Sequence, residues 1–127
     1  MKILSLIVLL VVSSCAYQQT GQTQPRLHII SDNIQFTQDG PNVTVTGKVF
    51  FTNISRVPAW NVKLQVVFMN DGKIIGIVDK EFPGETIQFD QVKEFEFTKD
   101  LFVPTNEPID LLINSWYQGN YATIYRR

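Results

Sequence analysis

The sequence predicts an all-β protein, an antiparallel β-sandwich of about seven strands that follows a signal peptide and a flexible tether. The sandwich is indicated by apolar side chains that alternate with polar ones from Arg26 onward, because successive side chains of a strand point to opposite faces. It is also indicated by Gly, Pro, Asn and Asp turn signals that separate these runs at intervals of about 8–12 residues. The signal peptide is indicated by an apolar run near the N-terminus, with the single cysteine behind it.

The composition is that of one globular domain. Of the 127 residues, 44% are hydrophobic and 18% are charged, an ordinary balance for a chain with one compact core. Lys and Arg number 11 and Asp and Glu number 12, so no excess of positive charge attracts nucleic acid. Cys15 has no second cysteine with which to pair, so the core must hold the fold without an intramolecular disulfide.

Two segments in the middle of the chain have the clearest strand patterns. In residues 42–53 the apolar side chains fall on odd positions, at Val43, Val45, Val49 and Phe51, with Phe50 as the exception. In residues 60–70 one face holds Trp60, Val62, Leu64, Val66 and Phe68, and the other holds Asn61, Lys63 and Gln65. Each segment is predicted to be a strand with one face in the core and one face in water.

Turn residues define the remaining elements. Asp71-Gly72 predicts a hairpin between residues 60–70 and a returning strand at 73–79, because both turn residues adopt positive φ at little cost. Pro83-Gly84 is expected to break the chain after that strand. The elements predicted beyond this break are a strand or bent pair at 86–98, a loop at 103–108, and a C-terminal hairpin of 109–117 and 120–127.

The first residues have the layout of a secretory signal peptide. Lys2 precedes a largely apolar run from Ile3 to Val12, which is about half the length of a helix that spans a bilayer. A positive start, a short apolar centre and small residues after it are typical of such a leader. Residues 1–14 are therefore predicted to be a signal peptide.

The residues Val12-Ser13-Ser14-Cys15 resemble the bacterial lipobox, in which an aliphatic residue and two small residues precede a lipidated cysteine. The resemblance implies that Cys15 receives a diacylglycerol and becomes the first residue of the mature protein. Because two or three acyl chains anchor stably where one holds only marginally, the implied partner is a membrane. An ordinary signal peptide with an unrelated cysteine near its cleavage site is the alternative.

Residues 15–25 are predicted to be the lipidated cysteine and a flexible tether. The ten residues after the cysteine contain four Gln and end in Pro25, so they are too polar to pack, and as a coil they reach about 17 Å. In enteric-type lipoproteins Asp after the cysteine tends to retain the protein at the inner membrane, whereas this chain has Ala16. The resemblance therefore implies the periplasmic face of the outer membrane. Residues 26–127 are predicted to form the sandwich domain.

A second resemblance covers about fifty residues of this domain. The residues that carry it are Gly47, Val49, Asn53, the stretch from Val62 to Lys73, Gly76, Pro83, Gly84, Glu85 and Phe89. This order is similar to the FxLYD family of immunoglobulin-like bacterial envelope domains, with Val66 to Asn70 in place of the aromatic-x-Leu-Tyr-Asp motif. The resemblance implies an immunoglobulin-like sandwich outside the cytoplasm, and it implies no reaction.

Catalytic motifs are absent from the sequence. His28 is the only histidine and Cys15 the only cysteine, so neither a Cys-His pair nor a His-rich metal site is predicted, and we expect no metal and no small-molecule cofactor. The enzymatic alternative is a small envelope glycan hydrolase that uses Glu94 and Glu96 as paired carboxylates. Because Phe95 and Phe97 alternate with them, the two glutamates are expected on a solvated face.

The sequence instead favours a non-catalytic binding or assembly module whose partner is an envelope protein. The residues predicted to bind it lie in the C-terminal hairpin, at Trp116, Tyr117, Tyr121, Tyr125 and Arg127. Tyr, Trp and Arg are the residue types that contribute most to interface energies. Strict alternation places Tyr121, Thr123, Tyr125 and Arg127 on one face of the last strand, and the alternative is that part of this set belongs to the core.

Overall fold

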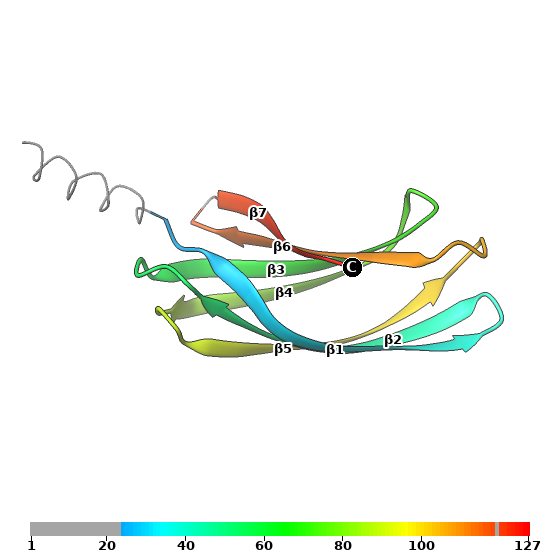
Figure 1. The fold of residues 1–127 in the computed structure, drawn as a ribbon, viewed down its shortest axis with the longest axis horizontal. Coiled ribbons are helices and arrows are strands. Elements are labelled where there is room, and N and C mark those ends of the chain that lie inside the picture. The colour runs from blue at the N-terminus through cyan, green and yellow to red at the C-terminus, as the bar shows by residue number, and fades with distance from the viewer. Residues whose placement is uncertain (1–23, 119) are drawn as a thin grey trace, which may run out of the picture.

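The computed structural model describes residues 24–118 and 120–127, and it is a β-sandwich of two antiparallel sheets (Figure 1). The all-β prediction is confirmed. The strands are β1 (Leu27–Asp39), β2 (Asn42–Asn53), β3 (Ala59–Asn70), β4 (Lys73–Ile87), β5 (Val92–Phe102), β6 (Ile109–Tyr117) and β7 (Asn120–Arg126). In the part of the chain described, no helix is long and apolar enough to cross a membrane.

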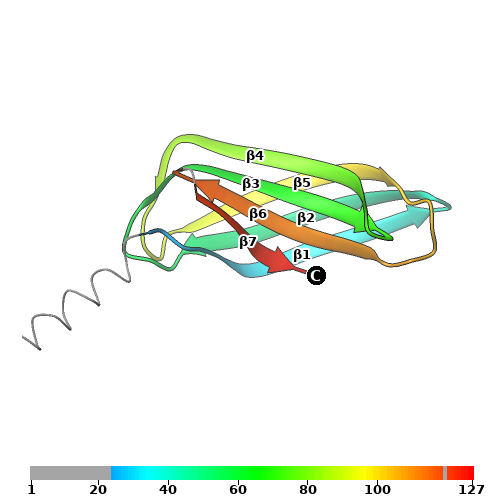
Figure 2. The same ribbon diagram turned by 90° about the horizontal axis from the view of Figure 1, so that it is seen from above.

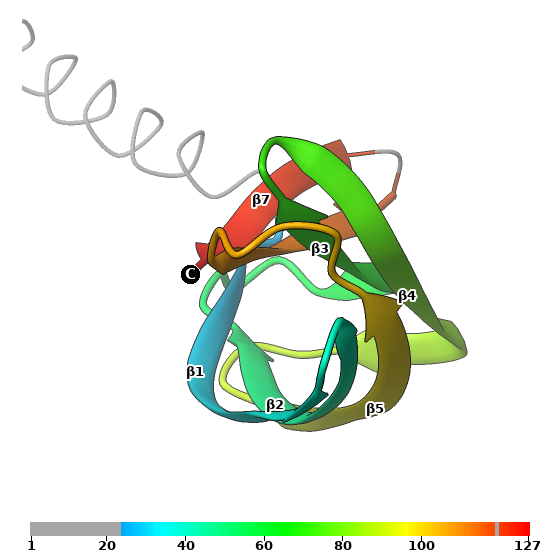
Figure 3. The same ribbon diagram turned by 90° about the vertical axis from the view of Figure 1, so that its right-hand side faces the viewer.

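The two sheets have the strand orders β1-β2-β5 and β4-β3-β6-β7 (Figure 2). The chain changes sheet after β2, after β4 and after β5, so each sheet contains strands from distant parts of the sequence. This is an immunoglobulin-like arrangement in which the fourth strand pairs with the third. Seen from its end, the sandwich has β1 beside β7 along one side and β4 beside β5 along the other (Figure 3).

The predicted inward faces fill the space between the sheets. Val45, Val49 and Phe51 of β2 are fully buried, and Leu64 and Phe68 of β3 face them from the other sheet. The aromatic rings pack edge to face or tilted, as rings in cores prefer, in the pairs Phe51–Phe82, Phe68–Phe97 and Phe95–Phe97. Gly47 leaves the space that the Phe97 ring occupies, because an added Cβ would overlap that ring.

The predicted hairpin at Asp71-Gly72 is confirmed. Asn70 pairs with Lys73, so the turn has two residues, and Asp71 and Gly72 have φ of 53° and 74°. Positive φ at both central positions is the backbone of a turn whose twist matches that of the flanking strands.

The prediction that Pro83-Gly84 breaks the chain is wrong. β4 runs through both residues to Ile87, and Phe82 pairs with Val62 on one side of them while Thr86 pairs with Trp60 on the other. The extra residues form a bulge, with Gly84 at φ 72°. Proline is tolerated there because β4 is an edge strand and a bulge needs no ladder amide from it. The next strand accordingly begins at Val92, later than predicted.

A second correction concerns the faces of β1 and β3. β1 is a full strand whose sequence does not alternate strictly, because a register shift near Ile30 moves its inward positions from odd to even numbers. In β3, Trp60 is 52% exposed whereas Val62 is buried. Asn61 has φ 51° and the register shifts at this point, so the bulge turns Trp60 away from the core.

Buried Asn53 joins the connections at the end where the described chain begins. Its side-chain oxygen accepts hydrogen bonds from the amides of Arg26 (3.1 Å) and Ser55 (2.9 Å). Its side-chain nitrogen donates to the carbonyls of Val57 (2.7 Å) and Ile87 (3.1 Å). One side chain therefore links the start of β1, the end of β2 and the end of β4.

Buried Asn70 has the corresponding place at the opposite end. Its side-chain nitrogen donates to the Glu107 carbonyl (2.9 Å), and its side-chain oxygen accepts from the Thr105 hydroxyl (2.9 Å). The loop between β5 and β6 is thereby held against the end of β3.

Two neighbouring residues can test which side chains of β3 point into the core and which point outward. Leu64→Ala should lower the free energy of unfolding by about 2–5 kcal/mol, because it removes buried apolar volume and leaves a cavity. Gln65→Ala, on the outer face, should change it by about 0.5 kcal/mol or less, since its bond to Asp79 is exposed. Urea unfolding followed by tryptophan fluorescence would measure both, and equal losses would contradict this assignment of faces.

Candidate functional site

The outer face of the three-stranded sheet is mainly polar, and it also carries Phe50 and the exposed Phe102. Lys48 pairs with Glu94 (3.1 Å) and Glu96 (3.4 Å), and the Thr44 hydroxyl donates to Asp100 (2.9 Å). A shallow depression of about 420 Å³ on this side is lined chiefly by Asn33, Gln35, Thr46, Lys48, Glu96 and Thr98. Side chains of this kind are satisfied by one another and by water, which makes this face a solvated surface.

The carboxylate pair lies on this polar face. Phe95 and Phe97 are buried, and Glu94 and Glu96 point outward, as their alternation predicts. Their hydrogen bonds to Lys48, that of Glu94 first, raise the pKa of the lysine. The geometry is thus two exposed acids that share one cation, and the site is open to water on the sheet surface.

The outer face of the four-stranded sheet carries more aromatic and apolar side chains. Directly paired residues of neighbouring strands share a face, so the register defines rows of side chains that run across the sheet. One row is Glu81, Lys63, Trp116 and Tyr121; the next is Asp79, Gln65, Asn114 and Thr123; a third is Ile77, Val67, Leu112 and Arg126; and beyond it lie Ile74, Met69 and Asp110. We call these rows the outer sheet surface.

An aromatic group lies at one end of the outer sheet surface. The rings of Trp116 and Tyr121 have centroids 4.8 Å apart and are tilted by 49°, and the Lys63 ammonium lies 5.4 Å from the Trp116 ring. Tyr121 is 57% exposed. Two aromatic rings in contact, with a cation over one of them, present a large and rigid contact area.

An apolar strip crosses the other half of the surface. Val67 is buried although it does not belong to the core between the sheets, because neighbouring side chains on the outer face cover it. Ile77 and Ile74 beside it are 40% and 60% exposed. Between the strip and the aromatic group, Asn114 is buried and accepts a hydrogen bond from Thr123 (2.8 Å).

The prediction that Tyr121 and Tyr125 share a face is wrong. Ile113 pairs with Tyr125 and Asn114 pairs with Thr123, so Ile124 is an extra residue that reverses the faces of β7. The Tyr125 hydroxyl donates to Asp32 (2.8 Å) on β1, and Arg127 lies 3.5 Å from the same carboxylate. Tyr125 and Arg127 therefore join the edges of the two sheets.

The other predicted binding residues are divided between the core and the surface. Tyr117 is 6% exposed and belongs to the core, whereas Trp116 and Tyr121 lie on the outer sheet surface. Cys15 lies outside the described residues. Within residues 24–118 and 120–127, no three His, Cys, Asp or Glu side chains come together as metal ligands.

Sequence reasoning missed the apolar strip. The signal was present, since Val66-Val67-Phe68-Met69 and Ile74-Ile75 are continuous apolar runs in strands that otherwise alternate. A strand that is apolar on both faces has its second face covered or available to a partner.

No protein family model matches the chain, and no curated protein matches it by sequence. Similar solved structures include a β-glucuronidase from glycoside hydrolase family 2 (TM-score 0.56, 13% identity, 80% of this chain). Others are a Bacteroides fragilis chain assigned as a β-galactosidase (0.56, 17%, 76%) and a Bordetella pertussis chain assigned as ApaA (0.51, 16%, 81%). This chain spans 12% of the β-glucuronidase, 15% of the β-galactosidase and 91% of the ApaA chain. At these identities the likeness shows a shared β-sandwich fold, and the lipobox and FxLYD resemblances stay predictions.

Tyr125→Phe should lower the free energy of unfolding at neutral pH by about 1 kcal/mol or less, because the lost hydrogen bond to Asp32 is partly exposed. Burial and then this hydrogen bond raise the pKa of Tyr125. A pKa raised on folding gives stability that is present below about pH 10 and lost as the pH rises further. Urea unfolding at neutral and alkaline pH should therefore show a smaller alkaline loss for Tyr125→Phe than for the unaltered protein. Tyr121→Phe is the control, and the same behaviour in both variants would contradict the assignment.

Proposed function

We propose that this chain is a membrane-anchored bacterial lipoprotein whose sandwich is a non-catalytic module that binds another protein of the cell envelope. The binding surface in this proposal is the outer sheet surface. The observation that carries it is the contrast between the two outer faces. One face carries mainly Thr, Lys and Glu side chains that pair with one another, with Phe50 beside Lys48 and Phe102 at its far end, whereas the other groups Trp116 with Tyr121 and Ile74 with Ile77.

The composition of this surface supports a protein partner. Aromatic residues and Met are enriched in the centres of protein interfaces, and charged residues in their rims. Here Trp116 and Met69 lie within the sheet, while Asp79 and Glu81 lie on edge strand β4 and Arg126 lies on edge strand β7. The central strands also carry Lys63 and Asp110, and the edge strands also carry Ile74 and Tyr121. Apolar and charged side chains are therefore mixed across the surface, which lets a contact bury apolar area while the free protein stays soluble.

The anchor in this proposal is the diacylglycerol on Cys15, supported by the signal-peptide layout and the residues before the cysteine. A lipid anchor confines the domain to one membrane, so a partner in the same envelope meets it at a high effective concentration. A surface of modest affinity then suffices for assembly.

The partner-binding role can be tested with matched pairs of aromatic residues. Replacing both Trp116 and Tyr121 by Ala should reduce capture of crosslinked partners from native membranes strongly, because such anchors each contribute about 2 kcal/mol or more at an interface centre. The control replaces Phe50 and Phe102, two aromatic residues of the opposite outer face, by Ala. Capture would be measured by mass spectrometry beside the melting temperature of each variant. Equal loss of capture in both double variants would contradict the proposed surface.

Cys15→Ser should abolish incorporation of labelled palmitate and leave an uncleaved or soluble protein, because the substitution removes the thiol that would carry the lipid. Metabolic labelling followed by membrane fractionation would measure both effects. Incorporation that persists in the Ser variant would exclude Cys15 as the anchor.

A further inference from the structure

Exposed apolar side chains gather at the end of the sandwich where the described chain begins. Ile54, Trp60, Phe89 and Val92 are 44%, 52%, 52% and 56% exposed, and we call them the tether-end cluster. All four belong to the same end of the sandwich as Asn53. Ile54 follows Asn53, Phe89 bridges to it, Val92 pairs with Thr52, and Trp60 pairs with Thr86 beside Ile87.

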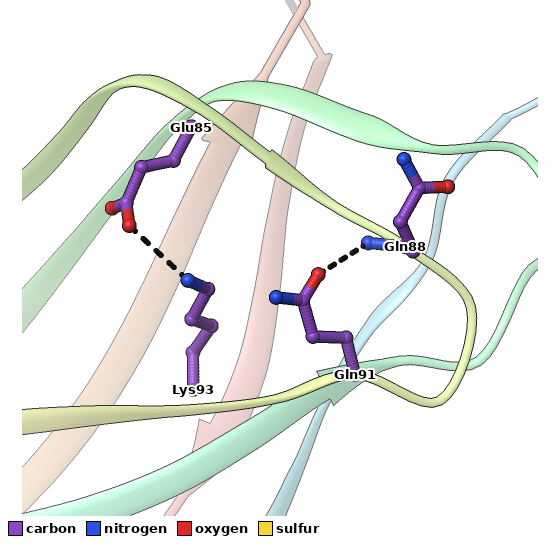
Figure 4. A network of polar contacts seen from close by, with 4 residues as sticks. All are labelled: Glu85, Gln88, Gln91 and Lys93. Carbon is purple, nitrogen blue, oxygen red and sulfur yellow. Dashed lines mark hydrogen bonds and ion pairs between the residues drawn. The ribbon is translucent and has the colours of Figure 1, made fainter.

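The turn that carries Phe89 is held in place by polar contacts (Figure 4). The Gln88 amide donates to the Gln91 side chain (3.0 Å), and Lys93 pairs with Glu85 (3.1 Å) across the two strands. The Asp90 amide donates to the Asn53 carbonyl (2.8 Å). The Phe89 ring is thus exposed on a turn that hydrogen bonds hold against the rest of the domain.

The same end lies where the chain leads back to Cys15. The Ile54 amide donates to the Arg26 carbonyl (2.8 Å), so Ile54 lies beside the first described residues, at the end of the sandwich where β1 begins (Figure 1). Nine residue steps separate Cys15 from Gln24, and no conformation of such a segment spans more than about 32 Å. The 12 residues of β2 extend about 37 Å along the sandwich.

These lengths exclude an upright orientation in which the far end rests on the anchoring membrane. The far end also exposes Ile74 and Phe102, and Phe102 pairs with Asn42 at the start of β2, so this end lies farther from the point of exit than the segment to Cys15 can reach. The exposed charges also differ between the two ends. The connections near the cluster carry Arg26 and Arg56 against Asp90, whereas the turns of the far end carry Asp39, Asp71 and Glu107 against Lys73. Cations beside apolar side chains suit an anionic lipid surface.

We infer that the tether-end cluster rests on the lipid surface that holds the Cys15 anchor, with Phe89 and Ile54 in the headgroup region and Trp60 at its border. The inference rests on the proposed lipid anchor and adds an orientation to it. The long axis of the sandwich then points away from the membrane, and the outer sheet surface stands along that axis, open to a partner. Tryptophan and aliphatic side chains with nearby arginines are the composition expected at such an interface.

The test uses the lipidated full chain in protein-free vesicles of phosphatidylethanolamine and phosphatidylglycerol. Because Cys15 is the only cysteine and its thiol carries the lipid, a cysteine introduced elsewhere is the only reactive thiol. Phe89→Cys and its matched control Phe102→Cys are labelled with an environment-sensitive fluorophore, and quenching by spin-labelled lipid is measured. We expect several-fold stronger quenching at position 89 than at position 102. Ile54→Cys against Ile74→Cys repeats the comparison at a second pair, and circular dichroism checks that all four variants are folded.

The outcomes separate this inference from the proposed anchor. The intact mass of the purified protein reports the lipid on Cys15, and an unmodified mass would overturn the anchor and the inference together. A lipidated protein with equal quenching at both ends would overturn the inference alone. Protection of position 89 in native membranes but not in protein-free vesicles would also overturn it, because the cluster would then face a protein.

Discussion

The side chain of Asn53 is the contact on which one whole end of the sandwich depends. Its amide makes two acceptor and two donor contacts in a position with no solvent exposure, which accounts for nearly all of its hydrogen-bonding capacity. A buried amide left without partners costs more than the bonds return, so the three chain segments around it form together. Asn70 has the same role at the far end. The loops are thereby ordered by polar contacts and the strands by apolar burial.

The two sides of the sandwich are closed by different means. Between β1 and β7, Asp32 points inward from its edge and receives Tyr125 and Arg127. Between β4 and β5, Leu101 lies against Gly76, where a larger residue would overlap it. Inward charges, bulges and an edge proline are devices that discourage the pairing of further strands, and Pro83 in the β4 bulge is one of them. The surfaces left for interaction are consequently the sheet faces and the ends.

The two ends and the two faces of the domain differ in composition, and these differences fit the proposed role. One end has apolar and cationic side chains around the exit of the N-terminal segment, and the far end has acidic turns. One sheet face is mainly polar, with Lys48 paired to Glu94 and Glu96, and the other combines Trp116 and Tyr121 with an apolar strip. In the proposed arrangement, the membrane and the protein partner therefore contact different parts of one rigid sandwich. The glycan hydrolase alternative lacks a comparable feature among the described residues, because Glu94 and Glu96 share Lys48 on an open surface.

The sequence by itself determined the class of fold, most of the core, the Asp71-Gly72 turn and the C-terminal hairpin of β6 and β7. A period of two identified the inward sets of β2 and most of β3, and Asp71-Gly72 specified its turn through the backbone conformation that the two residues accept. Tertiary structure alone decided which face Trp60 and Tyr125 occupy, and that β4 continues past Pro83. In each case one bulge adds residues to a strand and reverses every later side chain. A bulge is stabilised by the partner strand and by packing, and local alternation in the sequence reports neither. Of the predicted site, Trp116 and Tyr121 therefore lie on the outer face, while Tyr125 and Arg127 turn to Asp32.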